Sequence, residues 1–120
     1  MFEYEINKSR FIGIIYNVHT EDEVKEIIKK LWSENKRARH ICFAYRLISN
    51  GVFNEKGDDN GEPKGSAGLP LLNLLQLKKA ENVLVVVIRY FGGKLLGRSR
   101  LPGAYIKAAN GAYNKYLGDK

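Results

Sequence analysis

Val83-Leu84-Val85-Val86-Val87-Ile88 is the stretch of sequence that decides the fold, because it shows no alternation of polar and apolar residues. A strand with one face in water alternates, whereas a strand covered on both faces reads as a continuous apolar run. The stretch therefore predicts a central strand, apolar on both sides. Gly92-Gly93 follows it and is expected to end it.

Three more segments predict the other strands and their connections. Residues 11–18 are rich in Ile, Tyr and Val and predict a first strand. Residues 40–48 and 52–54 predict a hairpin, because Asn50-Gly51 between them is the dipeptide that a type I′ turn prefers. Residues 55–68 are polar and rich in Gly, and we expect them to form a long loop.

Three segments predict helices. Thr20 and Glu23 form a capping-box pattern before residues 21–35, where apolar residues recur at helical spacing. A second helix is expected over residues 70–79, with Pro70 in its first turn, and a third over residues 102–118. With one domain over residues 1–120, this order predicts an α+β fold in two layers: a four-stranded, mostly antiparallel sheet with helices packed on one face.

The charge is positive and unevenly placed. The formal net charge is +7, and residues 82–118 contain six Lys and Arg residues but no Asp or Glu. Residues 36–40 form a second basic stretch. Such a field concentrates polyanions such as nucleic acids near the surface. The alternative is that the positive charge only confers solubility.

The single cysteine, Cys42, excludes an intramolecular disulfide and a Cys-rich zinc site. No signal peptide is visible, and the longest apolar run is far too short to span a bilayer. We therefore expect a cytoplasmic protein that contacts no membrane.

Four separated motifs carry a resemblance to a known family. Residues 58–70, DDNGEPKGSAGLP, are similar to D-D-G-E-P-x-G-[ST]-A-G-x-P, and residues 85–97, VVVIRYFGGKLLG, look like V-V-V-x-R-Y-[FY]-G-G-x-x-L-G. Residues 8–12 match K-S-R-F-I, and residues 38–40 match A-R-H. By these motifs the chain resembles, over nearly its whole length, the N-terminal domain of the IMPACT/YigZ family.

The resemblance implies a fold like the second domain of the small-subunit ribosomal protein five, and a role in translation control. One branch of the family is connected to starvation signalling through an initiation-factor kinase. Many bacterial relatives carry a second, elongation-factor-like domain, and we expect this chain to be the single-domain form. It departs from the family at Asn60, which replaces an Asp, and at Arg98, Arg100 and Gly103, which stand in a segment that is T-G-G-L-x-[RK]-A-Y in many members.

The sequence gives little support to an enzyme. Cys42 and His40 lie two apart on a strand and so share a face, as a nucleophile and its base require, but a lone Cys among apolar strand residues is typical of a buried small hydrophobe. The carboxylates of Asp58, Asp59 and Glu62 lack the spacing of a cation-binding loop, and no phosphate-loop sequence occurs. We assign no catalytic residue, no metal and no cofactor.

A binding site for anions or nucleic acid has better support. Helices begin after residues 65–68 and after residues 97–100, helix N-termini favour anions, and Arg side chains donate to phosphates. The candidate anion site comprises Arg89, Tyr90, Gly92, Gly93, Lys94, Gly97, Arg98 and Arg100. The accompanying acidic loop comprises Asp59, Gly61, Glu62, Pro63, Gly65, Ser66 and Gly68.

Alternatives remain for this site and for the function. Tyr90 and Phe91 follow Arg89 at the exit of the strand, where an aromatic pair is suited to stack on bases. The alternative is that both pack against the sheet while Arg89 forms an internal ion pair with Asp59 or Glu62. The favoured function is an accessory protein that binds RNA or a ribosome-associated partner. There are two alternatives: an enzyme acting on a phosphorylated small molecule, and a protein-interaction regulator of translation without nucleic-acid contact. An enclosed pocket favours the enzyme, whereas an open basic groove favours RNA.

Overall fold

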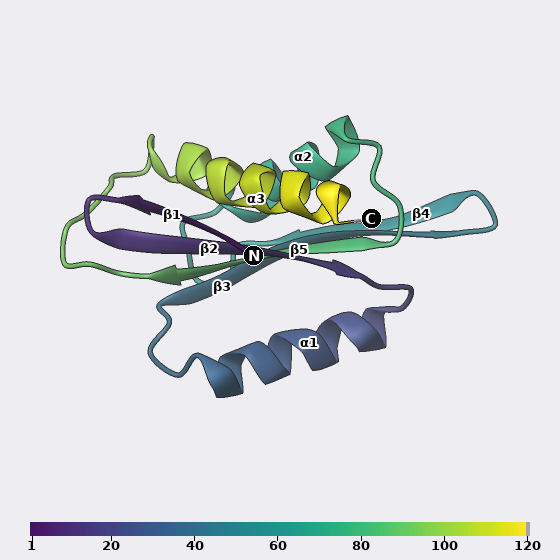
Figure 1. Ribbon diagram of the computed structural model, residues 1–120, viewed down its shortest axis with the longest axis horizontal. Coiled ribbons are helices and arrows are strands. Elements are labelled where there is room, and N and C mark those ends of the chain that lie inside the picture. The colour runs from purple at the N-terminus through teal and green to yellow at the C-terminus, as the bar shows by residue number, and fades with distance from the viewer. Residues whose placement is uncertain (120) are drawn as a thin grey trace.

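Strand β5 (Val83–Tyr90) lies at the centre of a five-stranded sheet in the computed structural model, which describes residues 1–119 (Figure 1). The strand order is β1-β2-β5-β3-β4, and every neighbouring pair is antiparallel. Strands β2 (Ser9–Asn17) and β3 (His40–Ser49) flank β5 on its two sides. The central place predicted from the apolar run is confirmed.

The predicted count of four strands is wrong by one. β1 (Phe2–Ile6) is an edge strand that pairs with β2, and the turn between them places Asn7 and Lys8 at φ values of 49° and 65°. The sequence Phe-Glu-Tyr-Glu-Ile alternates apolar and charged residues, which is the period of a half-buried strand. The signal was therefore present, although the segment is short.

The hairpin of β3 and β4 (Val52–Asp58) turns at the predicted dipeptide, where Asn50 and Gly51 both have positive φ. β4 extends beyond the predicted residues 52–54 into the segment expected to be loop. A glycine near its end allows this, because a Cβ on Gly57 would lie 2.3 Å from the carbonyl oxygen of Gly68. The backbone of β4 thereby touches the start of the next helix.

The three predicted helices are present, but they do not share one face of the sheet. α2 (Gly68–Leu77) and α3 (Leu101–Gly118) cover one face, and α1 (Glu21–Glu34) covers the other (Figure 1). The prediction of two layers with helices on one face is thus wrong, and the molecule has three layers. The central strand is the physical reason, because a strand that is apolar on both sides needs cover on both sides.

Two hydrophobic clusters result from this arrangement. Val83, Val85 and Val87 of β5 face α2 and α3, whereas the intervening residues of the strand face α1. The capping box that starts α1 forms as predicted: the Thr20 hydroxyl accepts a hydrogen bond from the Glu23 amide, and the Glu23 carboxylate accepts one from the His19 amide. None of the helices within residues 1–119 has the length and apolar character needed to cross a membrane.

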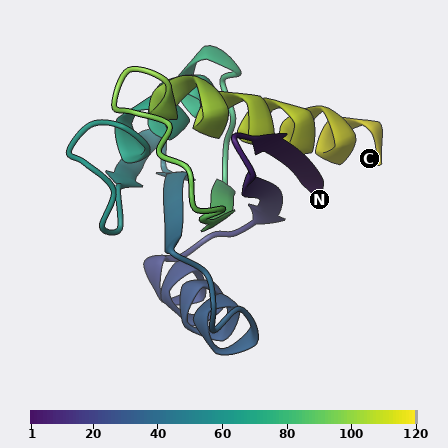
Figure 2. The same cartoon turned by 90° about the vertical axis from the view of Figure 1, so that its left-hand side faces the viewer.

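One end of the sheet brings together three connections that are distant in the sequence. The pairs Phe11↔Arg89 and His40↔Arg89 place the start of β2, the start of β3 and the end of β5 side by side. The β1–β2 turn, the α1–β3 connection and the β5–α3 loop therefore meet at this end, which faces the viewer in Figure 2.

Candidate functional site

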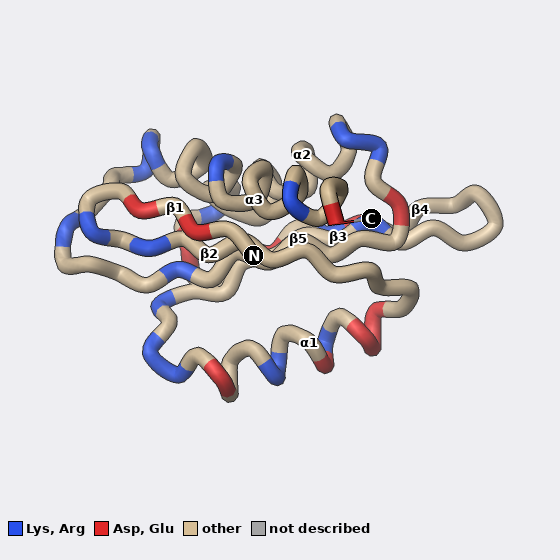
Figure 3. The backbone as a smooth tube through the Cα atoms, viewed as in Figure 1, with Lys and Arg blue, Asp and Glu red and all other residues tan. Residues whose placement is uncertain are grey.

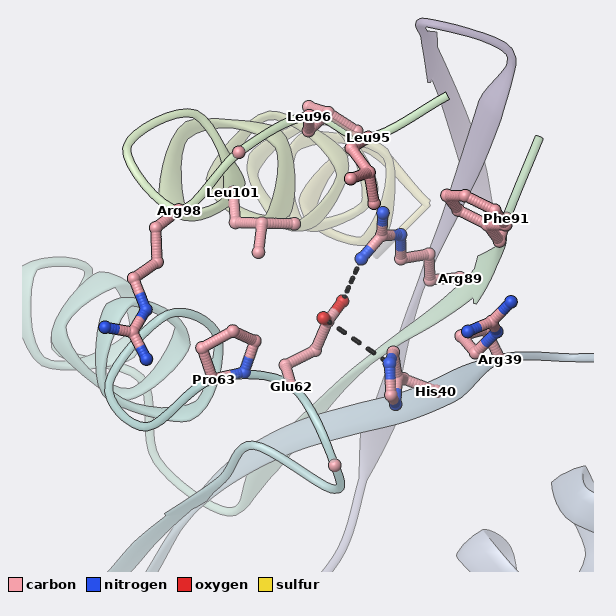
Figure 4. A pocket seen from close by; sticks show the side chains of 12 residues that line it. Arg39, His40, Glu62, Pro63, Arg89, Phe91, Leu95, Leu96, Arg98 and Leu101 are labelled. Atoms are coloured by element: carbon pink, nitrogen blue, oxygen red, sulfur yellow. Dashed lines mark hydrogen bonds and ion pairs between the residues drawn. The ribbon is translucent and has the colours of Figure 1, made fainter. Parts of the chain in front are cut away.

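An ion pair joins the acidic loop to the end of β5. Arg89 Nη1 donates to Glu62 Oε2 at 2.7 Å, and the two side chains are only 7% and 3% exposed. The nitrogen His40 Nε2 lies 3.4 Å from the other carboxylate oxygen of Glu62 (Figure 4). The structure thus forms the internal pair that the sequence left as an alternative for Arg89, and Glu62 rather than Asp59 is the partner.

The Glu62 carboxylate also accepts a hydrogen bond from the hydroxyl of Tyr105, a buried residue of α3. The Cys42 thiol lies 3.3 Å from the same hydroxyl and 3.0 Å from the carbonyl oxygen of Asp59. Burial raises the pKa of Cys42 to about 12 and raises the pKa of Tyr105 far above its usual value. Both groups stay protonated near neutral pH, which disfavours Cys42 as a nucleophile.

Asp59 caps helix α2 from within the acidic loop. Its carboxylate accepts hydrogen bonds from the amides of Gly65, Ala67 and Gly68 at 2.7–3.0 Å. Burial acts to raise the pKa of Asp59, but these three amides together outweigh it, so its pKa lies below the usual value. The helix N-terminus that we expected to attract an external anion is therefore filled by an internal one.

The remaining residues of the acidic loop shape its backbone. Asn60, the departure from the family motif, donates from its amide to the carbonyl oxygen of Ile41 at 2.6 Å. Gly61 has φ of 93° and packs against the His40 ring, and the Ser66 hydroxyl donates to the Pro63 carbonyl. Within residues 1–119, no three His, Cys, Asp or Glu side chains come together in a group that could hold a metal ion.

A cavity of about 320 Å³ opens beside the Arg89–Glu62 pair (Figure 4). Both loops line it, together with residues from the start of α3 and from the α1–β3 connection. Its lining consists of Arg39, His40, Gly61, Glu62, Pro63, Arg89, Phe91, Leu95, Leu96, Gly97, Arg98 and Leu101. The sequence had not assigned Arg39, His40, Leu95, Leu96 or Leu101 to the site, whereas Phe91 had been considered as a base-stacking residue. The match of residues 38–40 to the family motif was the available signal for the first two.

The glycines of the β5–α3 loop have different local settings. Gly92 lies against the β1–β2 turn, where a Cβ on it would come within 2.0 Å of the Lys8 carbonyl oxygen. Gly93 and Gly97 have φ values of 87° and 83°, which favour glycine. The Tyr90 side chain does not join the candidate site. Its hydroxyl donates to the Asn35 side chain, and its ring packs in the hydrophobic cluster under α1.

Exposed positive charge surrounds the cavity. Lys and Arg gather at the left-hand end of the molecule in Figure 3, where the three connections meet. We call the following residues the basic end: Lys8, Lys36, Arg37, Arg39, Lys94, Arg98 and Arg100. All are exposed, and no ion pair within residues 1–119 involves any of them. The Arg39 guanidinium lies over the Phe91 ring, 4.7 Å from its centre.

The comparisons with known proteins identify the family of the chain. Residues 7–113 match the model of the Impact N-terminal domain. The chain belongs to the Impact N-terminal domain family. It is 40% identical over 112 residues to the IMPACT family member YvyE of Bacillus subtilis (strain 168), a match that covers 93% of this chain and 51% of YvyE. The resemblance drawn from the four motifs is thereby confirmed.

Two solved structures share the fold. The crystal structure of a hypothetical protein superposes with a TM-score of 0.88 at 33% identity, covering 94% of this chain and 55% of that one. The two-domain translational regulator Yih1 superposes with a TM-score of 0.61 at 27% identity, covering 89% of this chain and 45% of Yih1. The α+β class is confirmed. The chain spans about half the length of the bacterial IMPACT family members that it matches.

Proposed function

We propose that this Impact domain is a cytoplasmic accessory protein of translation that binds RNA through the basic end. The observation that carries the proposal is the set of exposed Lys and Arg side chains, without acidic partners, on three connections at one end of the sheet. Exposed cations in such a group neutralise phosphates and release counterions from the nucleic acid. The description of Yih1 as a translational regulator supports translation as the setting.

The ion pair strengthens this proposal. Glu62 neutralises Arg89 below the surface, so the acidic loop does not cancel the charge of the exposed arginines. The cap formed by Asp59 likewise turns that carboxylate inward, onto the amides of α2. The positive charge of the basic end is therefore not cancelled by these two carboxylates.

An enzyme acting on a phosphorylated small molecule in the same cleft has weaker support. The buried groups next to the cavity bind one another: Arg89 and Tyr105 both bond to Glu62, and the Cys42 thiol has a pKa of about 12. General acid or base catalysis needs a group whose pKa lies near the working pH and which can reach the substrate. Cys42 and Tyr105 do not meet the first condition.

The test is a titration of a labelled single-stranded RNA pool by fluorescence anisotropy, at about 50 and 200 mM salt. Affinity should fall steeply with salt. In the variant Arg98→Ala/Arg100→Ala, the slope of log affinity against log salt should shrink by about 1.4, because each lost phosphate contact on a single strand removes about 0.7. The melting temperature should hardly change, since both side chains are exposed.

The matched control is Lys29→Ala/Lys30→Ala, which removes the same charge from exposed positions on α1. It should bind RNA nearly as the wild type does. No binding at the lower salt, or equal losses in both variants, contradicts the proposal. The first result would favour a regulator that contacts proteins only, and the second would mean that only the net charge matters.

A further inference from the structure

Arg89 has hydrogen-bonding capacity that the protein does not use. One terminal nitrogen, Nη1, donates to Glu62, whereas Nε is buried without an acceptor, and no acceptor in residues 1–119 takes Nη2 either. Nε and Nη2 form one edge of the planar guanidinium and present two parallel N–H groups, an arrangement that matches two adjacent acceptors. A buried donor without a partner is costly and calls for an explanation.

The cavity that Arg89 lines suits a small, flat and neutral group. Arg89 and Glu62 both line it and neutralise each other, so an anion placed there would meet the Glu62 carboxylate as well as the guanidinium. Its walls are largely apolar, with Phe91, Leu95 and Leu101 among them, and its volume of about 320 Å³ is small for a ligand site. Two exposed arginines, Arg39 and Arg98, belong to the same lining.

We propose that the cavity binds a guanine base of single-stranded RNA. The O6 and N7 atoms of guanine accept from Nη2 and Nε of Arg89, while Arg39 and Arg98 hold the flanking phosphates. This inference rests on the proposed function and names the nucleotide that the same site prefers. Single strands are the relevant form, because their unstacked bases expose all edges, whereas the major groove of an RNA duplex is too narrow for side chains.

The edge of Arg89 selects guanine among the bases. Guanine presents two adjacent acceptors, O6 and N7, and their bidentate contact with Arg is the commonest specific contact in DNA recognition. On the corresponding edge, adenine pairs the acceptor N7 with a donor, and cytosine presents a donor. A uracil carbonyl offers a single acceptor on this edge. Among these major-groove edges, guanine alone satisfies both free N–H groups of Arg89 together, whereas cytosine carries two adjacent acceptors, O2 and N3, only on its Watson–Crick edge.

The experiment compares three labelled RNAs of equal length: an oligouridine, the same oligomer with one central guanine, and a third with 7-deazaguanine at that position. We expect the guanine oligomer to bind at least about five-fold more tightly than oligouridine. The 7-deazaguanine oligomer should lose most of this preference, because it lacks the N7 acceptor. Free guanosine monophosphate should compete more weakly than the guanine oligomer, since it lacks the flanking phosphates that Arg39 and Arg98 would hold.

Variants at two leucines test whether the preference for guanine arises in the cavity. Leu95 lines the cavity and is 84% exposed, so Leu95→Trp should fill its mouth without disturbing the core and should abolish the preference for guanine. Leu77, at the end of α2, is 82% exposed and lies outside the lining, so Leu77→Trp should leave the preference intact.

The outcomes separate the two proposals. Salt-dependent binding of all three RNAs with equal affinity overturns the guanine site and leaves the proposed function standing. A preference for guanine that survives Leu95→Trp also overturns it, because the base would then bind elsewhere. Free guanosine monophosphate binding more tightly than the guanine oligomer would instead make this a site for a free nucleotide. Binding to none of the RNAs would end both proposals.

Discussion

Replacing Glu62 should be among the most destabilising single changes in this domain. Glu62→Met keeps the approximate size of the side chain but leaves Arg89 as an unpaired charge that is only 7% exposed. Removing one partner of a buried ion pair costs about 3–5 kcal/mol of unfolding free energy. The hydroxyl of Tyr105 loses its acceptor in the same variant.

The expected fall in melting temperature follows from the chain length. An unfolding entropy of about 2.1 cal/mol/K per residue gives about 0.25 kcal/mol/K for 120 residues. A loss of 3–5 kcal/mol then lowers the melting temperature by about 12–20 °C. Differential scanning calorimetry measures the shift, and urea unfolding gives the free energy. Glu26→Met is the control, because Glu26 is exposed on α1, and it should change stability by less than about 0.5 kcal/mol.

The double variant Glu62→Met/Arg89→Met decides whether the pair itself is responsible. Removing both charges leaves no unpaired ion, so the double variant should be more stable than Glu62→Met alone. About 1–3 kcal/mol of the loss should remain, because Tyr105 still lacks an acceptor. If Glu62→Met costs less than about 1 kcal/mol, or if the losses of the two single variants simply add in the double, then Arg89 is not a buried partner of Glu62 and the description of the site is wrong.

Three further results are expected from the surroundings of the site. The thiol of Cys42 should resist Ellman's reagent at pH 8 until the protein unfolds, because its pKa is about 12, and rapid labelling of the folded protein would contradict this. The pKa of Asp59 is lowered in the folded protein, so the ionised carboxylate stabilises the fold at pH values above 3.8, the usual pKa of Asp. This contribution is lost as the pH falls through the folded-state pKa. Urea unfolding at pH 7 and pH 3 should therefore show a smaller acid-induced loss in Asp59→Ala than in the wild type, and equal losses would exclude the cap. Gly103→Ala should raise stability by about 0.5–1 kcal/mol, because Gly103 lies in α3 with open space around it, whereas Gly92→Ala should lower stability because of the Lys8 backbone. If thermal unfolding shows that Gly103→Ala and Gly92→Ala change stability in the same direction, this reasoning is wrong.

The sequence predicted those parts of the fold that depend on a few neighbouring residues. The apolar run of β5, the Thr20 capping box and the Asn50-Gly51 turn each specify their structure within a few residues, and each is present. The number of layers was missed, although the apolar run already required cover on both faces of the sheet. β1 was missed because five alternating residues at a sheet edge give a weak signal.

The site could be predicted only in part, because its contacts join distant segments. Opposite charge on the two loops indicated an ion pair, but Asp59 and Glu62 were equal candidates until the structure of the loop after β4 showed Glu62 beside Arg89. Asp59 instead caps the helix that starts nine residues later, and this role depends on the loop geometry. Sequence spacing gave no indication that Arg39 and Phe91 would stack, since 52 positions separate them and only the pairing of the adjacent strands β3 and β5 brings them together.

The position of β5 has a consequence for the order in which the chain folds. Strands β1 and β2 form one hairpin and β3 and β4 another, but the two hairpins do not pair with each other, because β5 lies between them. During synthesis from the N-terminus, both hairpins are complete before residue 83 leaves the ribosome, yet neither has the neighbour that covers its inner edge. Isolated hairpins are marginally stable at best, and contacts between distant residues slow folding. We therefore expect cooperative folding to wait for β5, so that a nascent chain ending before Val83 remains open to proteases and one extending beyond α3 does not.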